Sequence, residues 1–268
     1  MICHYTSFEA LLGIVHPNAL LFRATRFSHL DDPNEFKWAL EKLKIKECDY
    51  MEEYPYVISF CKTYDSLNMW KLYGHNGLGV MLCIDEKILL DEIEKEQNSK
   101  PYLDTMKIGQ DVVYANDNNF NDKVSNFINE FQKSYYGQLD EEDKTAFIEA
   151  SAFIKRDDYE IEQEWRYTLF NFSYFTIKYN KQDPSSPIFE DEKENTKNIK
   201  IHTNRSKQYT VIELPIESLK GIVIGYNIPN EWIVMLRTYL PHLNSKYSAI
   251  INNIKKSKYS KKDENDNY

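Results

Sequence analysis

The segment that most constrains the fold is residues 159–170, which read YEIEQEWRYTLF. Four of its apolar residues share one parity, namely Ile161, Trp165, Tyr167 and Leu169. Such alternation is typical of a β-strand with one buried face. Glu162, Glu164 and Arg166 would then share the opposite face, with successive carboxylates roughly 7 Å apart. The sequence therefore predicts a strand that carries two acids and one base side by side.

Two like charges at that distance repel by about 2 kcal/mol at an effective dielectric constant near 20. In a partly dry site one carboxylate should therefore keep its proton to a higher pH than the other, and Arg166 should offset part of the repulsion. Such a face suits a site that stabilises a positive centre and hydrogen-bonds a hydroxyl. The alternative is the solvated face of an edge strand, and the segment alone leaves both open.

Composition narrows the class of protein. The chain has 268 residues with 42% hydrophobic content, which suffices for one sizeable domain. Its net charge of -9 argues against broad electrostatic binding to nucleic acid, although a local basic groove stays open. With 20 Tyr and 14 Phe against 8 Gly, a glycine-rich phosphate loop is not expected, and neither GxGxxG nor a P-loop occurs.

The cysteines indicate the compartment. They form no CxxC pair, so no zinc site is signalled, and their scatter fits reduced thiols in a cytosol: Cys3, Cys48, Cys61 and Cys83. The chain begins MICHYTSFEA without a charged-then-apolar leader, and its apolar runs are too short to span a membrane. We expect a cytoplasmic protein with no membrane association and no bound metal.

The order of predicted elements is irregular, which favours an α+β fold with a mixed, mostly antiparallel sheet flanked by helices. We expect one domain over residues 1–254, with a helical insertion at about 116–154 and a mobile acidic loop at about 181–197. A T-x-x-E capping box predicts a helix over 7–15. Residues 140–154 also read as a helix, and the charged tail 255–268 should be disordered.

Near the N-terminus, His4, Tyr5 and Thr6 end a predicted strand just before a helix. A helix N-terminus offers unpaired amides to a phosphate, and His4 could hydrogen-bond a ribose there. The alternative for His4 is a half-buried structural histidine. Arg23 could clamp a phosphate, or it could pair with the acidic loop that follows its strand.

In the middle of the chain, Ser59 lies on a predicted buried strand, and Trp70 and Tyr73 share one face of a short helix. Aromatic rings on a cleft wall could stack on a nicotinamide or a base, although rings at helical spacing usually pack in a core. Lys155, His75 and His202 have no evident partner in the sequence, so we assign them no chemistry.

Several of these pieces, in this order, resemble an uncharacterised prokaryotic family with H-Y-T-S, N-D-P-x-E, S-F-S, M-W-x-x-Y and E-x-E-W-R motifs. The resemblance covers roughly the first 230 residues, and Asp31 and Cys61 depart from the Asn and Ser of the family pattern. The matching segments are His4-Tyr5-Thr6-Ser7, Asp31-Asp32-Pro33-Asn34-Glu35, Ser59-Phe60-Cys61, Met69-Trp70-x-x-Tyr73 with Gly79, and Glu162-x-Glu164-Trp165-Arg166.

The chain is more remotely similar to the ADP-ribosyltransferase-like superfamily, which places a His or Arg, then a Ser or aromatic residue, then a Glu in this order along the chain. That resemblance implies a split sheet, NAD as substrate, and an unknown protein or nucleic-acid acceptor. It implies Glu164, Glu162, His4 and Tyr73 as catalytic residues. The residues that it implies for binding NAD are His4, Tyr5, Thr6, Arg23, Ser59, Trp70 and Tyr73.

Three hypotheses of function follow from the sequence. The first is an NAD-dependent ADP-ribosyltransferase or NAD glycohydrolase, acting as a toxin or antiviral defence effector, in which Glu164 stabilises the ribosyl cation and Glu162 orients the acceptor. The second is a phosphodiester hydrolase with Mg²⁺ held by Asp31, Asp32, Glu162 and Glu164. The third is a non-catalytic sensor or interaction module of a defence system.

Overall fold

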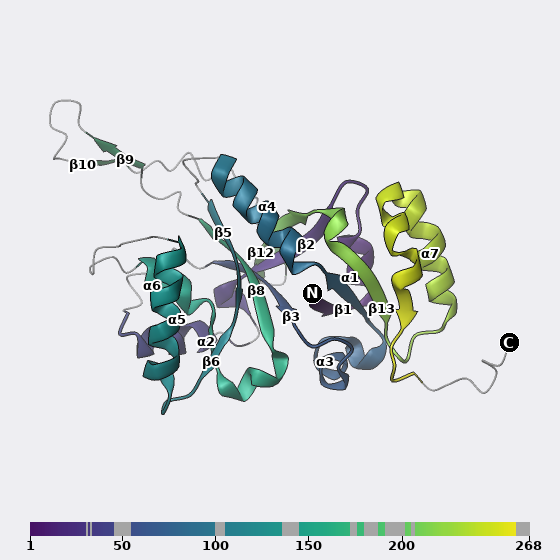
Figure 1. Ribbon diagram of the computed structural model, residues 1–268, viewed down its shortest axis with the longest axis horizontal. Coiled ribbons are helices and arrows are strands. Elements are labelled where there is room, and N and C mark those ends of the chain that lie inside the picture. Colours follow the sequence, from purple (N-terminus) through teal and green to yellow (C-terminus); the bar gives the residue numbers. More distant parts are fainter. Residues whose placement is uncertain are drawn as a thin grey trace.

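The computed structural model describes residues 1–30, 32, 34–45, 55–99, 105–135, 145–171, 176–179, 187–190, 202–204 and 207–260. Ten strands in these ranges form one mixed, mostly antiparallel sheet, and helices cover its faces (Figure 1). The predicted α+β class is thereby confirmed. The described residues do not include Asp31, Cys48, segments 181–186 and 191–197 of the expected acidic loop, or residues 261–268 of the expected tail.

The strands of the main sheet are β1 (Ile2–Thr6), β2 (Leu20–Arg26), β3 (Tyr56–Cys61), β4 (Val80–Ile84), β5 (Thr105–Asp111), β8 (Glu164–Asn171), β11 (His202–Asn204), β12 (Lys207–Leu214), β13 (Leu219–Ile224) and β14 (Ile254–Lys256). Two parallel strands, β6 (Val113–Ala115) and β7 (Ile154–Arg156), form a separate pair, and so do the antiparallel β9 (Thr176–Tyr179) and β10 (Pro187–Glu190).

The helices are α1 (Phe8–Ile14), α2 (Asn34–Lys42), α3 (Leu67–Leu72), α4 (Glu86–Ser99), α5 (Phe120–Tyr135), α6 (Thr145–Ser151) and α7 (Glu231–Leu243). None of the helices in the described ranges is both long enough and apolar enough to cross a membrane.

The main sheet forks at β3. Along one edge, β3 pairs with β8 over its whole length, from Tyr56 to Cys61. Along the other edge, Cys61 pairs with β1, whereas Tyr56 and Val57 pair with β2. Between these two ends, residues 58–60 form no register pair with β1 or β2. The sheet therefore opens into a gap at Ser59.

The two faces of the sheet are covered differently. On one face a single continuous core packs beneath α1, α4 and α7, with Phe22, Phe60 and Trp165 among its buried rings. On the other face two separate clusters form. One lies under α2, α5 and α6, and the other lies under α3. Ser59, which belongs to neither cluster, is exposed between them.

Three predicted boundaries are wrong by a few residues. Helix α1 is capped one residue later than predicted, because the amide of Ala10 donates to the Ser7 hydroxyl. The helix predicted to reach Ile154 ends at Ser151, and the chain continues as β7. Residues 187–190 form strand β10 inside the region expected to be a loop.

The C-terminal tail is ordered further than predicted. Residues 254–256 form β14 beside β13, and Ser257 is buried. The anchor is Asp65, a buried residue with a left-handed φ of 47° that Asp tolerates better than most residues. Its carboxylate accepts hydrogen bonds from Ser257 Oγ at 2.7 Å and the Lys258 amide at 2.8 Å. It also accepts one from the Trp70 indole at 2.7 Å, so the tail is tied to α3.

We expect Asp65→Ala to lower the free energy of unfolding by about 3 kcal/mol, because three donors lose a charged, buried acceptor. Chemical denaturation measures the change, and limited proteolysis reports the release of the tail. Asp91→Ala, at an exposed position of α4, is the control. Equal stabilities of the two variants would contradict the anchoring role.

Candidate functional site

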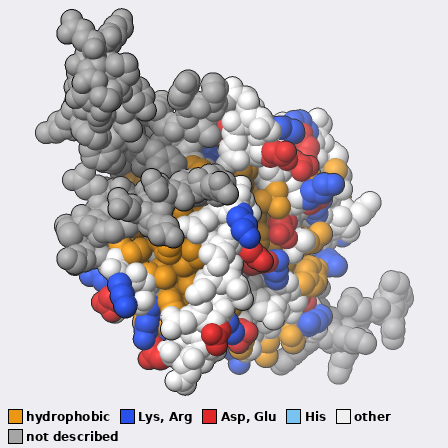
Figure 2. All heavy atoms as spheres, turned by 60° about the vertical axis from the view of Figure 1, so that its left-hand side comes forward, with side chains coloured by type: hydrophobic (Ala, Val, Ile, Leu, Met, Phe, Trp, Pro, Cys, Tyr) orange, Lys and Arg blue, Asp and Glu red, His pale blue; other side chains and the backbone are white. Residues whose placement is uncertain are grey.

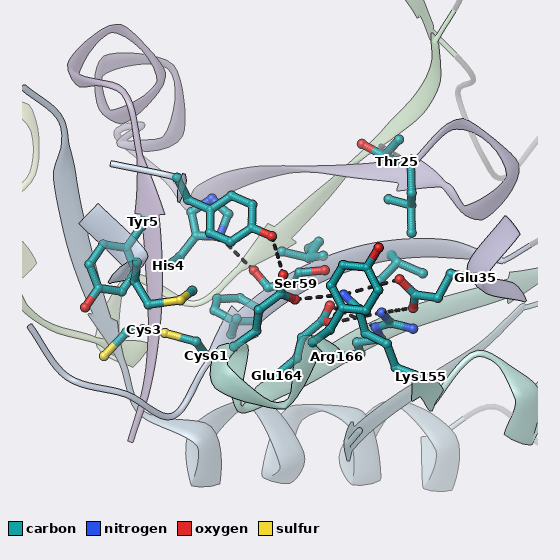
Figure 3. Close-up of a pocket in the computed structure, with 18 of the residues that line it drawn as sticks. Cys3, His4, Tyr5, Thr25, Glu35, Ser59, Cys61, Lys155, Glu164 and Arg166 are labelled. Atoms are coloured by element: carbon teal, nitrogen blue, oxygen red, sulfur yellow. Dashed lines mark hydrogen bonds and ion pairs between the residues drawn. The ribbon is translucent and has the colours of Figure 1, made fainter. Parts of the chain in front are cut away.

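A cavity of about 420 Å³ lies above the gap in the sheet. It is on the face where α3 covers one cluster of buried residues and α2, α5 and α6 cover the other. Figure 3 shows that its labelled side chains come from β1, β2, β3, α2, β7 and β8. Most of the predicted site residues line it: His4, Tyr5, Arg23, Ser59, Tyr73, Glu162 and Glu164. Residues up to about 160 positions apart in the chain therefore meet in one hollow.

Two predicted ligand-binding residues lie elsewhere. The ring of Trp70 is fully buried under α3, and its indole nitrogen donates to Asp65. It is therefore not available to stack on a ligand, and the alternative of core packing is right. Thr6 pairs with Val80 in the sheet and does not line the cavity.

His4 fills the gap between β1 and β2. Its Nδ1 lies 2.9 Å from the carbonyl oxygen of Ser59, and because that oxygen only accepts, Nδ1 carries the proton. The ring packs edge-on against Phe22 and Phe60, with centroids 5.1 and 5.6 Å away. Burial lowers the pKa of His4 below its usual value, against the opposing effect of the Ser59 bond. His4 is therefore neutral near pH 7, with an unprotonated Nε2.

The charged side of the cavity is organised around Lys155, to which the sequence assigned no role. Its ammonium lies 2.7 Å from Glu162 Oε2 and 3.2 Å from Glu164 Oε2. It also lies 3.2 Å from Glu35 Oε2. All four side chains are buried. One cation thus bridges three carboxylates that would otherwise repel one another.

Arg166 is the second cation of this group. Its Nε donates to Glu164 Oε1 and its Nη2 to Glu164 Oε2, each at 2.9 Å. Nη2 also bonds to Glu35, and Nη1 donates to the carbonyl of Ala152, just after the end of α6. We call these five residues the ion cluster: Glu35, Lys155, Glu162, Glu164 and Arg166.

The ion cluster lowers the pKa of Glu164, whereas repulsion between neighbouring carboxylates was expected to keep one of them protonated to higher pH. Burial alone raises the pKa of Glu164, but the charges of Arg166 and Lys155, with hydrogen bonds from Arg166 and Ser59, outweigh burial and lower it to about 2. The expected repulsion between neighbouring carboxylates therefore does not raise the pKa of this group. Burial acts to lower the pKa of Lys155. The negative charges of Glu164, Glu35 and Glu162 outweigh burial, so the pKa lies above its usual value.

The acidic segment is only partly the predicted strand. Strand β8 begins at Glu164, and its alternation holds, because Glu164 and Arg166 lie on the cavity face while Trp165 and Tyr167 lie in the core. Glu162 instead belongs to a 3-10 turn, η4 (Asp157–Glu162), and Gln163 follows with a left-handed φ of 42°. This turn leaves Ile161 exposed and brings Glu162 to Lys155 from outside the strand.

Glu162 and Glu164 differ in how many hydrogen bonds their carboxylates already accept. Glu164 accepts from Arg166, Lys155 and Ser59, which engages both of its oxygens. Among the described residues, Glu162 accepts from the Tyr73 hydroxyl at Oε1 and from Lys155 at Oε2, both at 2.7 Å. Since a carboxylate offers about four lone-pair sites, Glu162 retains acceptor capacity for a ligand.

Three residues to which the sequence analysis assigned no role complete the site: Lys155, Glu35 and Tyr159. Glu35 ends the N-D-P-x-E-like segment, so the resemblance contained a signal for it. Tyr159 packs its ring 4.6 Å from the Lys155 ammonium and donates from its hydroxyl to Asp32 at 3.1 Å. No local pattern marks Lys155, because its three partners come from other elements.

Three of the four carboxylates of the magnesium hypothesis already have partners, and the fourth, Asp31, lies outside the described residues. The space between Glu162 and Glu164 is taken by the Lys155 ammonium, and Asp32 accepts from Tyr159. Within the described ranges, no group of three or more His, Cys, Asp or Glu residues is arranged to hold a metal ion.

One family comparison bears on this site. Residues 69–167 match the family model described as a protein of unknown function, DUF2971. The expected resemblance to an uncharacterised family is confirmed over this segment. The DUF2971 segment contains Tyr73, Lys155, Glu162, Glu164 and Arg166, whereas His4 and Glu35 lie outside it. No curated protein and no solved structure matched the chain.

Replacing Lys155 tests whether the ion cluster holds the site together. We expect Lys155→Met to lower the free energy of unfolding by about 3–5 kcal/mol, because Arg166 would be the one cation left in the cluster and it does not pair with Glu162. Urea denaturation measures the loss. Lys95→Met, which removes an exposed ion pair with Glu92, is the matched control and should change stability little. A Lys155→Met protein as stable as the control would contradict this role.

The lowered pKa of Glu164 predicts an acid-sensitive contribution to stability. Because the folded-state value of about 2 lies below the usual 4.5, this contribution is complete above about pH 4.5 and is lost as the pH falls toward 2. Glu164→Gln should therefore flatten the pH dependence of unfolding in that window. If the two proteins lose stability in parallel below pH 4.5, the assignment to Glu164 is wrong.

Proposed function

We propose that the cavity binds NAD⁺ and cleaves its bond between nicotinamide and ribose, passing the ADP-ribosyl group to water or to an acceptor. The observation that carries the proposal is that His4, Tyr73 and Glu162 line one cavity although they are distant in sequence. These are residues that the resemblance to ADP-ribosyltransferases implies. The cavity volume of about 420 Å³ lies within the range of small-molecule sites.

The reaction places particular demands on such a site. When the ribose C1′–N bond breaks, the bonding electron pair leaves with the nicotinamide nitrogen, and positive charge develops on the ribosyl ring. A fixed anion close to C1′ stabilises that oxocarbenium-like state. The acceptor then attacks C1′ and releases its proton to a base or to water. No proton has to reach the leaving group, because the departing nicotinamide is neutral.

The geometry favours Glu162 as the carboxylate that meets the ribose, in place of the Glu164 of the initial hypothesis. Glu162 has unused acceptor capacity, and Tyr73 orients it. Glu164, which Arg166 and Lys155 saturate, supplies fixed negative charge and keeps both cations in place. The neutral His4 can accept a ribose hydroxyl at Nε2.

The diphosphate would be held at the mouth of the cavity. Arg23 is exposed there, with its guanidinium 5.0 Å from the centre of the Tyr209 ring, and a guanidinium suits a diphosphate. Figure 2 shows basic side chains interspersed with acidic ones over the described residues of the face in view.

Release of nicotinamide from NAD⁺, followed by chromatography, tests the proposal. We expect release by the wild type and a loss of about 10²–10³-fold in Glu162→Gln, because the anion facing C1′ is removed. Glu160→Gln, an exposed acid in the same turn, should retain the rate. Thermal unfolding of both variants checks that they fold. No release by the wild type, with water or with added protein or nucleic-acid acceptors, would refute the proposal.

A further inference from the structure

The ion cluster is not electrically balanced. Glu35, Glu162 and Glu164 are three anions, whereas Lys155 and Arg166 are two cations, so the cluster carries one surplus negative charge. Its members are all less than 10% exposed, so water screens this charge weakly. Among the described residues, the other charged side chains that line the cavity are Arg23 and Asp32, which have opposite signs and leave the sum unchanged.

The surplus negative charge of the ion cluster lies at Glu162. Glu35 and Glu164 are each shared between Lys155 and Arg166. Glu162 pairs with Lys155 alone among the cations of the cluster, and its second oxygen accepts from the neutral Tyr73 hydroxyl. Both Glu162 and Tyr73 line the cavity, so the excess negative potential faces the space that a ligand would enter.

The neighbouring wall suits a flat ring. Tyr73 is 42% exposed beside this carboxylate, and aromatic rings attract organic cations. Cys3, Cys61 and Met69 line the same cavity with polarisable sulfur atoms, which make favourable contacts with aromatic rings. Burial raises the pKa of Cys61 to about 12, so its thiol stays protonated and adds no competing charge.

We infer that the cavity selects a flat organic monocation, a pyridinium, over a neutral ring of the same shape. The identity of the cation rests on the proposed function, because NAD⁺ carries a pyridinium, whereas its sign rests on the charge of the ion cluster. It follows that NAD⁺ binds in preference to its reduced form. Cleavage converts the pyridinium into neutral nicotinamide, so the same charge that retains the substrate favours release of the product.

Binding of two small rings tests the inference without any turnover. The probes are 1-methylnicotinamide, a permanent cation, and 1-methyl-1,4-dihydronicotinamide, its neutral counterpart with the same heavy atoms. Titration calorimetry at pH 7.5 and 0.15 M salt should show the cation binding at least about tenfold more tightly. In Glu162→Gln the ratio should fall to about one, whereas Glu160→Gln should keep the wild-type ratio.

Each outcome decides the matter. Equal affinities for the wild type, tighter binding of the neutral ring, or no binding of either overturns the inference, and this comparison needs no variant. A preference that persists in a folded Glu162→Gln also overturns it. Nicotinamide release is measured separately, so cleavage of NAD⁺ without cation preference rejects this inference alone. A preference for the cation without cleavage rejects the proposed reaction but retains the selectivity.

Discussion

The Lys155 ammonium, held among three buried carboxylates, is the interaction on which the site depends. A buried carboxylate without a partner is strongly unfavourable, and three together would not stay ionised in a dry interior. Lys155 and Arg166 make the arrangement possible by bridging Glu35, Glu162 and Glu164. The same contacts join α2, β7, η4 and β8, so the charge of the site and the position of its walls have one origin.

The fork of the sheet explains why the ion cluster borders an open space. Because β1 and β2 leave β3 at opposite ends, the middle of β3 has a free edge, and His4 occupies it through Ser59. On the same face, α3 covers one end of the sheet, while α2, α5 and α6 cover the other. The cavity is the interval between these covers, and the exposed Ser59 marks its floor.

Much of the fold could be predicted because it follows from local patterns. The alternation in β8 correctly separated Glu164 and Arg166 from Trp165 and Tyr167. It failed at Glu162, because Gln163 adopts a left-handed φ just before the strand begins, and periodicity does not report such a turn. The tail was predicted to fray from its charge, but Asp65 anchors it through contacts almost 200 residues away in sequence.

The sequence by itself determined the α+β class, the positions of most helices and strands, and the chemical character of the residues that meet in the cavity. Only the tertiary structure decided how those residues are charged and which of them can reach a ligand. Lys155 is the clearest case, because no periodic pattern marks it, and only the fold brings its three carboxylate partners from α2, η4 and β8 to one ammonium. Periodicity is a local property of the chain, whereas a buried charge depends on every group that the fold brings near it.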